Sequence, residues 1–567
     1  MNNNKPIPIP GRWTLGASLL ISSLVLPGTG HGNPHEEPAD SPNIILILAD
    51  DMGYSDLHCY GSEISTPNLD RLADNGLRFT QFYNNARSCP TRASLLTGVY
   101  QHQAGIGHMG GGKYGDTDAY QGYLKESVIT IADVLNRSGY FTAMTGKWHL
   151  GMRDASMKPM AKGFDRYYGF PKGAGNYFGR MFDRPGHILE RNGQEILRRG
   201  EAYPANWYAT FEWAEKGVDF IQEATKQDKP FFLYLAFNAP HWPLQAPDSV
   251  MNQYAGRYMK GWKALRKERF QRMKQIGLID DTYRLPEFDD KVKPWASLTR
   301  QQKLKQDSIM AAYAACVDLM DQSIGRMLDY LRETDELENS LIFFLSDNGG
   351  CAEGPGNGLG NNVTRNADPA GPIGSAKSFV RCGRGWATAQ NTPFRLYKHW
   401  SHEGGINTPF IVHWPNGIED QGAIRNQPGH IIDVMATCVD VAGARYPSTH
   451  EGSEIIPYEG VSLLPALNNK KLGRDTLCWE HEGNRAIRIG SWKLVSRTEK
   501  RRVFDKQDLD AWELYHMATD PTETPNLAAQ YPEKVQAMKQ AWFQWAEKKK
   551  ILPWPWSDND FVRSELR

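Results

Sequence analysis

The sequence has no excess of charge of either sign. Its 567 residues contain 65 Lys and Arg against 65 Asp and Glu, so the formal net charge is zero. A basic surplus is typical of proteins that bind nucleic acids or anionic membrane surfaces, and bulk charge therefore indicates neither partner. The hydrophobic fraction of 40% is ordinary for a soluble globular protein. The length exceeds that of one ordinary core, so we expect two domains.

Cysteine is scarce and shows no pattern. There are seven Cys, an odd count that cannot pair fully. No C-x-x-C pair and no Cys/His cluster has the spacing of a zinc site. Cys316 and Cys438 lie in apolar patterns of helical spacing, and we expect both to be buried as small hydrophobic side chains.

Long apolar runs are absent except at the N-terminus. Basic residues Lys5 and Arg12 precede a short apolar segment, Trp13 to Leu26, and a stretch rich in Gly, Pro and Glu follows it. This layout is typical of a secretory signal and is short for a membrane span. We therefore expect residues 1–32 to be a signal peptide and flexible leader, and the mature protein to be secreted or periplasmic, without a membrane span. An uncleaved anchor is the alternative.

Continuous apolar runs of strand length are present in the remaining chain: 43–49, 231–237, 341–345 and, shorter, 410–413. Such runs are typical of strands buried on both faces of a parallel sheet. Helical patterns between them, at 66–77 and 304–331, predict an α/β domain with a large, mostly parallel sheet flanked by helices, over residues 42–470. Residues 250–305 lack clear strands, and the Gly- and Asn-rich 352–392 predicts a long loop.

The last part of the chain has a different texture. Residues 486–495 have the pattern of an antiparallel hairpin, and residues 532–547 that of an amphipathic helix. We expect residues 471–567 to form a small C-terminal α+β domain.

Polar residues follow the buried runs where these end. The first run ends in Asp50 and Asp51, another in Asp347 and Asn348, and a third leads to His241. Functional groups gather beyond the carboxyl ends of parallel strands, and carboxylate and amide oxygens are the ligands preferred by Ca²⁺ or Mg²⁺. Each pair alone also fits a turn or a helix cap.

A second feature is the segment RSCPTRASLLTGVY, residues 87–100. Pro90 and the small and apolar residues after it indicate a helix start, whose free N–H groups favour an anion. Arg92 adds a fixed cation in the first turn. These features together predict an anion site near a divalent cation, suited to phosphate or sulfate esters, and they do not choose between the two.

The same segment resembles the signature of the formylglycine-dependent sulfatases, a Cys or Ser followed by x-P-S/T-R and then x-x-x-L-T-G. Here it reads Ser88-Cys89-Pro90-Thr91-Arg92 and then ASLLTG. The resemblance covers nearly the whole mature chain, because DDMGYSD, GKWHLG, APHWPLQAP, SDNGG, KHWSHEGG and WELYHMATDPTE also match the family. It implies the sulfatase fold of the alkaline phosphatase superfamily.

The register of this signature identifies the residue to be modified. Counting back from Arg92 through Thr91 and Pro90 places Cys89 at the variable position and Ser88 at the modified one. The resemblance therefore implies a Ser-type sulfatase of bacterial source, in which a radical maturase oxidises Ser88 to formylglycine. An unmodified Ser88 in an inactive protein is the alternative.

The resemblance also implies a mechanism and a set of site residues. One Ca²⁺ is expected on Asp50, Asp51, Asp347, Asn348 and residue 88. A hydrate of formylglycine attacks the sulfur of a sulfate ester, an aryl sulfate in an assay and a sulfated glycan in nature. Arg92 and Lys147 are expected to hold residue 88, and His149 to remove a proton. His241 and Lys398 are expected to contact the sulfate and the leaving oxygen. His402 is given no role, and for His102 and His108 a structural role is favoured.

Two other functions remain open from the residues. A phosphomonoesterase or phosphodiesterase of the same superfold would use Ser or Thr directly and would need further His and Asp ligands for two metals. A non-catalytic protein that binds sulfated glycans would keep the pocket and lose a reactive residue, and no expected position is missing.

Overall fold

The computed structural model describes residues 41–114, 117–179, 188–197, 203–204, 206–354, 359–362, 371–497 and 511–552. The predicted signal peptide and leader, residues 1–32, lie outside this part of the chain. Ser41 to Arg567 group into one compact unit. The division into domains at 42–470 and 471–567 stays a prediction. Across the described residues, no helix combines the length and the apolar character that crossing a membrane requires.

A mixed sheet of eleven strands forms the centre of the described residues. Its middle consists of parallel strands in the order β8, β1, β7, β3, β4. Their bounds are Ser340–Ser346, Asn43–Ala49, Phe231–Ala236, Phe141–Lys147 and Arg166–Phe170. Every residue of β1, β7 and β8 is buried, which confirms that the continuous apolar runs are strands covered on both faces.

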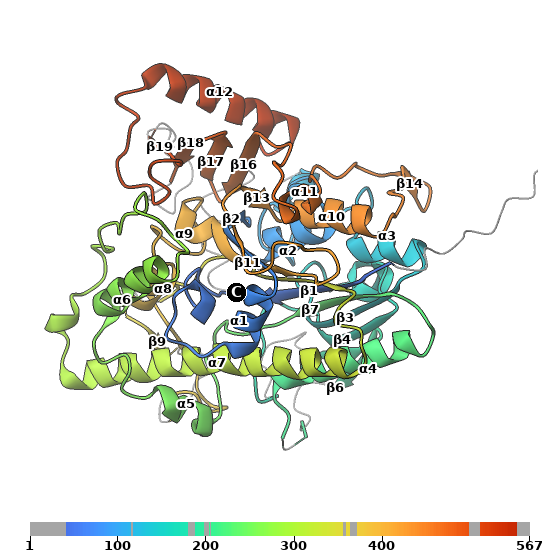
Figure 1. The fold of residues 1–567 in the computed structure, drawn as a ribbon, viewed down its shortest axis with the longest axis horizontal. Helices are drawn as coiled ribbons and strands as arrows, with labels where there is room; N and C mark the ends of the chain where they lie inside the picture. Colours follow the sequence, from blue (N-terminus) through green and yellow to red (C-terminus); the bar gives the residue numbers. More distant parts are fainter. Residues whose placement is uncertain are drawn as a thin grey trace, which may run out of the picture. The chain divides into compact units, whose positions relative to one another are not determined.

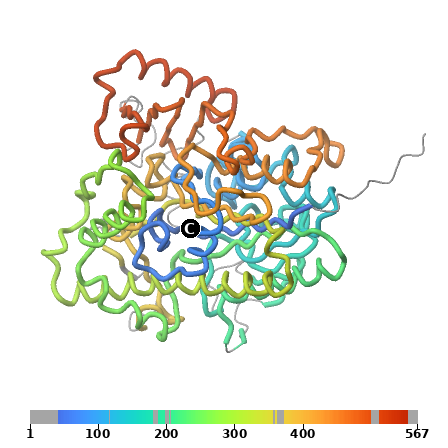
Figure 2. The backbone as a smooth tube through the Cα atoms, viewed as in Figure 1, coloured from blue at the N-terminus to red at the C-terminus, as the bar shows by residue number. Residues whose placement is uncertain are grey.

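The two margins of the sheet are less regular. On one side β11 (Asn407–His413) lies antiparallel to both β8 and β2 (Leu77–Tyr83). The short strands β12 (Ile424–Arg425) and β13 (Gly429–His430) each pair with β2 in parallel. On the other side β5 (Leu189–Arg191) and β6 (Gln194–Leu197) add an antiparallel ribbon to β4. Figure 2 shows the early, blue part of the chain beside the orange part after residue 400, in agreement with the pairing of β2 and β11.

Helices cover both faces of this sheet (Figure 1). Ile45 and Ile47 of β1 pack on the side of α1 (Pro67–Asp74), α4 (Ala209–Thr225) and α7 (Arg300–Glu333). Ile44 and Leu46 face the other way, towards α2 (Ser88–Thr97), α3 (Ile131–Arg137) and α10 (Asp433–Val441). Because successive side chains of a strand point to opposite faces, one apolar strand supplies both layers of the core.

Several predicted elements differ in extent from those observed. The helix predicted at 66–77 ends at Asp74, because Leu77 already belongs to β2. The helix predicted at 304–331 begins earlier, at Arg300, where Thr299 and Gln302 form a capping box. The segment 250–305 includes most of α5 (Asp248–Tyr254), all of α6 (Trp262–Gln275) and the first turn of α7. The expected loop at 352–392 was wrong in part, since α8 (Arg384–Gln390) lies within it and buries Trp386.

The C-terminal sheet consists of β16 (Thr476–His481), β17 (Asn484–Ile489), β18 (Trp492–Ser496) and β19 (Trp512–His516), all antiparallel. The predicted hairpin is β17 and β18, with Ala486 opposite Val495. One face packs on Tyr83, Ala86 and Ile406 beside the large sheet. The other face is covered by α12 (Pro532–Lys548), whose Trp542 is fully buried. The predicted fold, a large mostly parallel sheet with a smaller α+β part, is confirmed.

All seven cysteines lie in the described residues, and all are buried free thiols. Cys316 and Cys438 are fully buried among apolar neighbours, as predicted.

Candidate active site

The acidic pairs after β1 and β8 meet at one edge of the sheet. The two strands are neighbours, with Ala49 opposite Ser346, so the residues that follow them come together. The backbone N–H of Asp51 donates to Asp347 Oδ1 over 3.2 Å, and Asn348 Nδ2 donates to Asp51 Oδ1 over 2.8 Å. Asp50, Asp51, Asp347 and Asn348 are all buried. Asp51 has a left-handed backbone with φ 66°, a conformation that clusters at functional sites.

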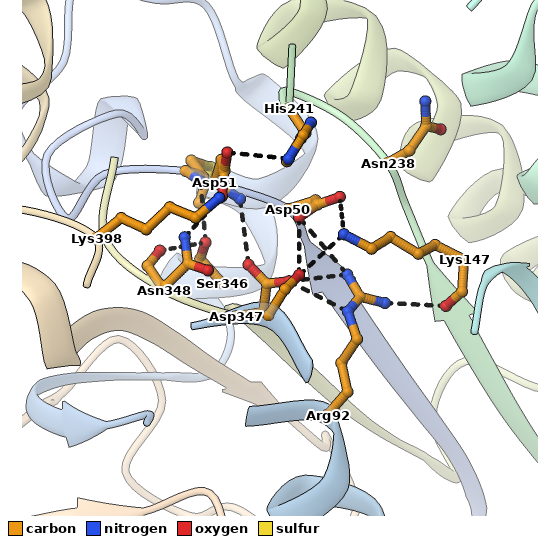
Figure 3. A network of polar contacts seen from close by, with 12 residues as sticks. Asp50, Asp51, Arg92, Lys147, Asn238, His241, Ser346, Asp347, Asn348 and Lys398 are labelled. Atoms are coloured by element: carbon orange, nitrogen blue, oxygen red, sulfur yellow. Dashed lines mark hydrogen bonds and ion pairs between the residues drawn. The ribbon is translucent and has the colours of Figure 1, made fainter. Parts of the chain in front are cut away.

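The first turn of α2 lies against this acidic cluster. Ser88 begins the helix, and its Oγ contacts Asp347 Oδ2 and, at 3.2 Å, Asp50 Oδ1. One turn later Arg92 donates from Nε and Nη2 to Asp347 Oδ2, over 3.2 Å and 3.0 Å, and from Nη1 to the Lys147 carbonyl oxygen over 2.9 Å. Figure 3 shows the guanidinium of Arg92 pointing at the Asp50 and Asp347 carboxylates.

Lys147, the last residue of β3, reaches the same place from another strand. Its Nζ donates to Asp50 Oδ2 over 2.6 Å and to Ser88 Oγ over 2.9 Å. Gly146 makes this close approach possible: its φ is +93°, and a Cβ there would lie 1.9 Å from the Ala236 carbonyl oxygen. The sheet thus holds an ammonium group directly against the oxygen of residue 88.

His241 and Lys398 contact Asp51 from two further loops. Lys398 Nζ donates to Asp51 Oδ1 over 2.7 Å, and His241 Nε2 lies 3.4 Å from Asp51 Oδ2 (Figure 3). His241 Nδ1 lies 2.5 Å from the Trp242 carbonyl oxygen. Because a carbonyl only accepts, this contact places a ring hydrogen on Nδ1, and Nε2 is the nitrogen that faces the Asp51 carboxylate.

His149 lies two residues beyond Lys147 and has a left-handed backbone, φ 62°. A Cβ on Gly173 would lie 2.2 Å from its Cε1, so the ring packs directly on a glycine. Burial, together with the nearby charges of Lys147 and Arg92, lowers the pKa of His149 well below 6.5. The ring is therefore neutral near pH 7.

The buried carboxylates differ in how well their charge is compensated. Burial raises the pKa of Asp50 to about 6, although Lys147 opposes the shift. Burial acts in the same direction on Asp51, but His241, Lys398 and Asn348 together hold the pKa of that carboxyl below its usual range. Two buried oxygens, Asp51 Oδ2 and Asn348 Oδ1, have no hydrogen-bond partner within the described residues. Buried acceptors of this kind are costly unless a cation or a donor contacts them.

Two residues not singled out in the sequence complete the surroundings. Glu353, in the loop after β8, lies 3.4 Å from Arg87 Nη2 and 3.8 Å from Lys398 Nζ, and accepts from Trp242 Nε1 over 3.0 Å. Arg87 directly precedes Ser88 in the segment 87–100 but carried no predicted role, and no sequence pattern points to Glu353 in its loop. Of the other histidines, His102 pairs with Glu480 and His402 contacts Glu513, away from the acidic cluster.

Comparison with known proteins decides between the chemistries that this geometry allows. Residues 42–444 match the family model described as Sulfatase. The chain belongs to the sulfatase family. Residues 394–549 of this sulfatase also match a model described as N-sulphoglucosamine sulphohydrolase, C-terminal. Family membership makes the chain a sulfuric ester hydrolase, and neither a phosphoesterase nor a purely binding function is favoured.

Curated relatives span nearly the whole sulfatase. It is 33% identical to an uncharacterized sulfatase of Schizosaccharomyces pombe, over 93% of this chain and 96% of the relative. It is 35% identical to an arylsulfatase of Klebsiella aerogenes, over 78% and 94%. Among solved structures, Ps i-CgsB matches with a TM-score of 0.66 and 25% identity, covering 93% of this chain and 97% of that one.

Proposed function

We propose that this sulfatase uses residue 88, oxidised from Ser to formylglycine, as its nucleophile, with one Ca²⁺ bound beside it. The observation that supports this most is the position of Ser88 Oγ, which contacts Asp50, Asp347 and Lys147 at the edge of the sheet. A Ser hydroxyl that serves as a nucleophile usually needs an adjacent base such as His. Among the described residues, the hydrogen-bond partners of Ser88 Oγ are carboxylates and an ammonium group, which favours a modified residue over plain Ser.

The donor set fits a calcium ion. The proposed ligands are oxygens of Asp50, Asp51, Asp347, Asn348 and residue 88, and hard oxygen ligands are the set that Ca²⁺ prefers. Asp51 Oδ2 and Asn348 Oδ1 are buried without a hydrogen-bond partner among the described residues, so both oxygens are available to contact such an ion. When bound, the ion would polarise the sulfate oxygens and favour ionisation of a hydroxyl on residue 88.

The charges of the site favour an anionic substrate once a dication is bound. The three carboxylates, Asp50, Asp51 and Asp347, face three basic side chains, those of Arg92, Lys147 and Lys398, and all six residues are buried. A dication adds two positive charges to this balanced set. The negative charge of a sulfate ester and of an ionised hydroxyl on residue 88 would offset them, since buried charges persist only when paired.

The formylglycine hydrate would supply two hydroxyls on one carbon, one to attack sulfur and one whose deprotonation allows sulfate to leave. Lys147 and Arg92 hold the oxygen of residue 88 and its neighbour Asp347 in place. His149, neutral near pH 7, takes the proton of the second hydroxyl. His241 and Lys398 contact the sulfate and donate a proton to the leaving oxygen as the sulfur–oxygen ester bond breaks.

We propose a sulfated glycan as the natural substrate and an aryl sulfate as a suitable assay substrate. Ps i-CgsB, the 25% identical structure, has also been solved with k-i-k-neocarrahexaose, again matching over 93% of this chain. An arylsulfatase is among the curated relatives. A panel of sulfated mono- and oligosaccharides, tested beside an aryl sulfate, would identify the substrate, and turnover of the aryl sulfate alone would contradict the glycan proposal. Secretion or export to the periplasm remains part of the proposal, because residues 1–32 have the pattern of a signal peptide.

Maturation is the sharpest test of the nucleophile. The protein is expressed with and without a radical maturase that oxidises Ser, and the peptide that contains residue 88 is weighed. Maturation should remove the mass of two hydrogens from Ser88 and switch on aryl sulfatase activity. Ser88→Ala, which cannot be oxidised, is the matched control and should stay inactive. An aldehyde at Cys89, or full turnover with unmodified Ser88, would overturn the proposal.

A second experiment tests the metal. Chelation of the matured enzyme should abolish turnover, and Ca²⁺ should restore it, because the proposed ligands are all oxygens. Asp347→Ala should lose both calcium binding and activity while the sheet stays folded, since Asp347 follows the last residue of β8. Recovery with Zn²⁺ alone, or full activity of the chelated enzyme, would count against the calcium site.

A further inference from the structure

A second cluster of side chains of metal-ligating types lies near Arg87 and consists of His108, His481 and Glu482. His108 comes from the loop after α2, His481 is the last residue of β16, and Glu482 follows it in the turn to β17. All three are buried, with exposed fractions of 3%, 1% and 7%. These residues are far apart in the sequence, so no spacing motif marks them. The packing of the C-terminal sheet on the catalytic part brings them together.

The distances within this cluster fit a small cation. Glu482 Oε1 lies 3.0 Å from His108 Nδ1 and 3.6 Å from His481 Nε2, and one ligand atom of each residue lies within 4.8 Å of the others. Zinc bonds to imidazole nitrogen and carboxylate oxygen are about 2.0–2.2 Å long, which places neighbouring ligands of a tetrahedron roughly 3.3–3.6 Å apart. The distances of 3.0 Å and 3.6 Å bracket this spacing, and small side-chain shifts would complete it.

His481 points to a ligand independently of the distances. Its ring is 1% exposed, yet neither Nδ1 nor Nε2 has a hydrogen-bond partner among the described residues. An unprotonated ring nitrogen of His481 offers a lone pair to a cation. A buried polar group without a partner costs free energy comparable to a lost hydrogen bond. Coordination of that lone pair would remove the cost.

A second layer of contacts orients the carboxylate. His399 Nδ1 lies 3.1 Å from Glu482 Oε2, and Asn484 Nδ2 lies 3.2 Å from His399 Nε2. The Asn484 amide donates to Nε2, which leaves the ring hydrogen of His399 on Nδ1, directed at Glu482. Ligating carboxylates are commonly held by such hydrogen bonds. His399 has a left-handed backbone, φ 93°. Glu482, φ 49°, and Gly483 form the two-residue turn between β16 and β17, in which a left-handed backbone is ordinary.

We propose that His108, His481 and Glu482 form a second metal site that takes zinc or a similar first-row divalent transition metal. Imidazole nitrogens favour such ions over calcium, so the site differs in kind from the all-oxygen set beside Ser88. The nearby cation, Arg87, lies 3.4 Å from Glu353, which takes up its charge. Three protein ligands leave a fourth position for water. The site would link the loop after α2 to the C-terminal sheet and stabilise their packing.

The proposal is tested on the full chain without a histidine tag, dialysed against zinc and then against buffer. Metal analysis should find one zinc per chain, and Co²⁺ in its place should give the visible absorption of a low-symmetry nitrogen and oxygen site. His481→Ala and Glu482→Gln should both lose the zinc and the Co²⁺ spectrum. His516→Ala, on β19 of the same sheet and outside the cluster, is the matched control and should keep both.

Graded variants separate a ligand from a neighbour. His399→Ala should weaken zinc binding by about 10–100-fold without abolishing it, because His399 only orients Glu482. Zinc should raise the melting temperature of the wild type and leave that of His481→Ala unchanged. Asp347→Asn, which disturbs the calcium set, should still bind zinc, so failure of this proposal is distinguishable from failure of the calcium mechanism.

Two outcomes would overturn the second site. One is an absence of zinc from the folded wild-type protein after dialysis. The other is zinc binding that both His481→Ala and Glu482→Gln retain in full. Circular dichroism shows whether each variant is folded. Glu482→Gln preserves the shape of the side chain, so it serves as the test if His481→Ala does not fold.

Discussion

Replacing Arg92 with Met removes a guanidinium that is fully buried between two strand ends and the first turn of α2. It makes three hydrogen bonds, two to Asp347 Oδ2 and one to the Lys147 carbonyl oxygen. Without Arg92, Asp347 Oδ2 would keep only the neutral Ser88 hydroxyl as a donor. Met fills a similar length with apolar atoms. The variant therefore leaves the Asp347 carboxylate buried with less compensation, and we expect both stability and activity to fall.

The magnitude follows from the burial. Breaking a buried ion pair by removing one partner costs about 3–5 kcal/mol, because the remaining charge is left without its partner. Arg92→Lys keeps the charge but not the planar fork that donates to Asp347 and to Lys147 at once. We expect it to cost about 1–3 kcal/mol, in the range of one lost hydrogen bond to a charged group. Loss of a buried electrostatic contact at a reacting centre lowers kcat by about 10²–10³-fold, and we expect this for Arg92→Met.

The assay is urea denaturation followed by fluorescence, performed once in chelator and once in saturating Ca²⁺. Arg92 and the proposed calcium ion both compensate Asp347 and repel each other. Removing Arg92 should therefore tighten calcium binding, and by linkage the stability lost in Arg92→Met should be smaller in Ca²⁺ than in chelator. An equal or larger loss in Ca²⁺ would refute the reasoning, since it would mean that the ion and Arg92 do not share Asp347.

Three further predictions concern other parts of the sulfatase. His241→Ala and Lys398→Ala should lower turnover most for substrates with poor leaving groups, and equal losses on aryl and sugar sulfates would indicate sulfate binding alone. Cys89→Ala should keep nearly full activity after maturation, and loss of the aldehyde at residue 88 in this variant would contradict the register. We expect it to lose about 1 kcal/mol of stability, because Cys89 is buried and its Sγ accepts from the Gly110 N–H over 3.2 Å. Burial lowers the pKa of His413 from 6.5 to about 4, so between these pH values the unfolded chain takes up a proton that the folded chain excludes. The free energy of unfolding should therefore fall by at most about 3 kcal/mol as the pH drops from 6.5 to 4. His413→Gln should make the free energy of unfolding less dependent on pH, and an unchanged pH dependence would exclude His413 as its source.

Much of the fold followed from local pattern. Continuous apolar runs such as 43–49 have to be buried on both sides, and only a sheet covered by helices on both faces does this. Periodicity also located α7 and α12, because a helix buries one stripe of side chains at a fixed spacing. The missed helix α8 lies in a stretch whose Gly and Asn residues indicated a loop. Trp386, which packs against Trp262 of α6 and Trp295, is buried by a distant segment that local sequence does not reveal.

By itself, the sequence determined which residues end the buried strands and which residue is proposed to be modified. Asp50 and Asp347 directly follow buried apolar runs, and Ser88 is identified by the register of the signature. Both are local properties of the sequence that do not depend on contacts between distant residues. Tertiary structure alone decided their surroundings. Glu353 meets Lys398 and Arg87 only because separate loops converge, and the antiparallel direction of β11 depends on its partners. Likewise, the cluster around Glu482 exists because the C-terminal sheet packs beside the loop that holds His108, and long-range packing leaves no periodic trace in a chain.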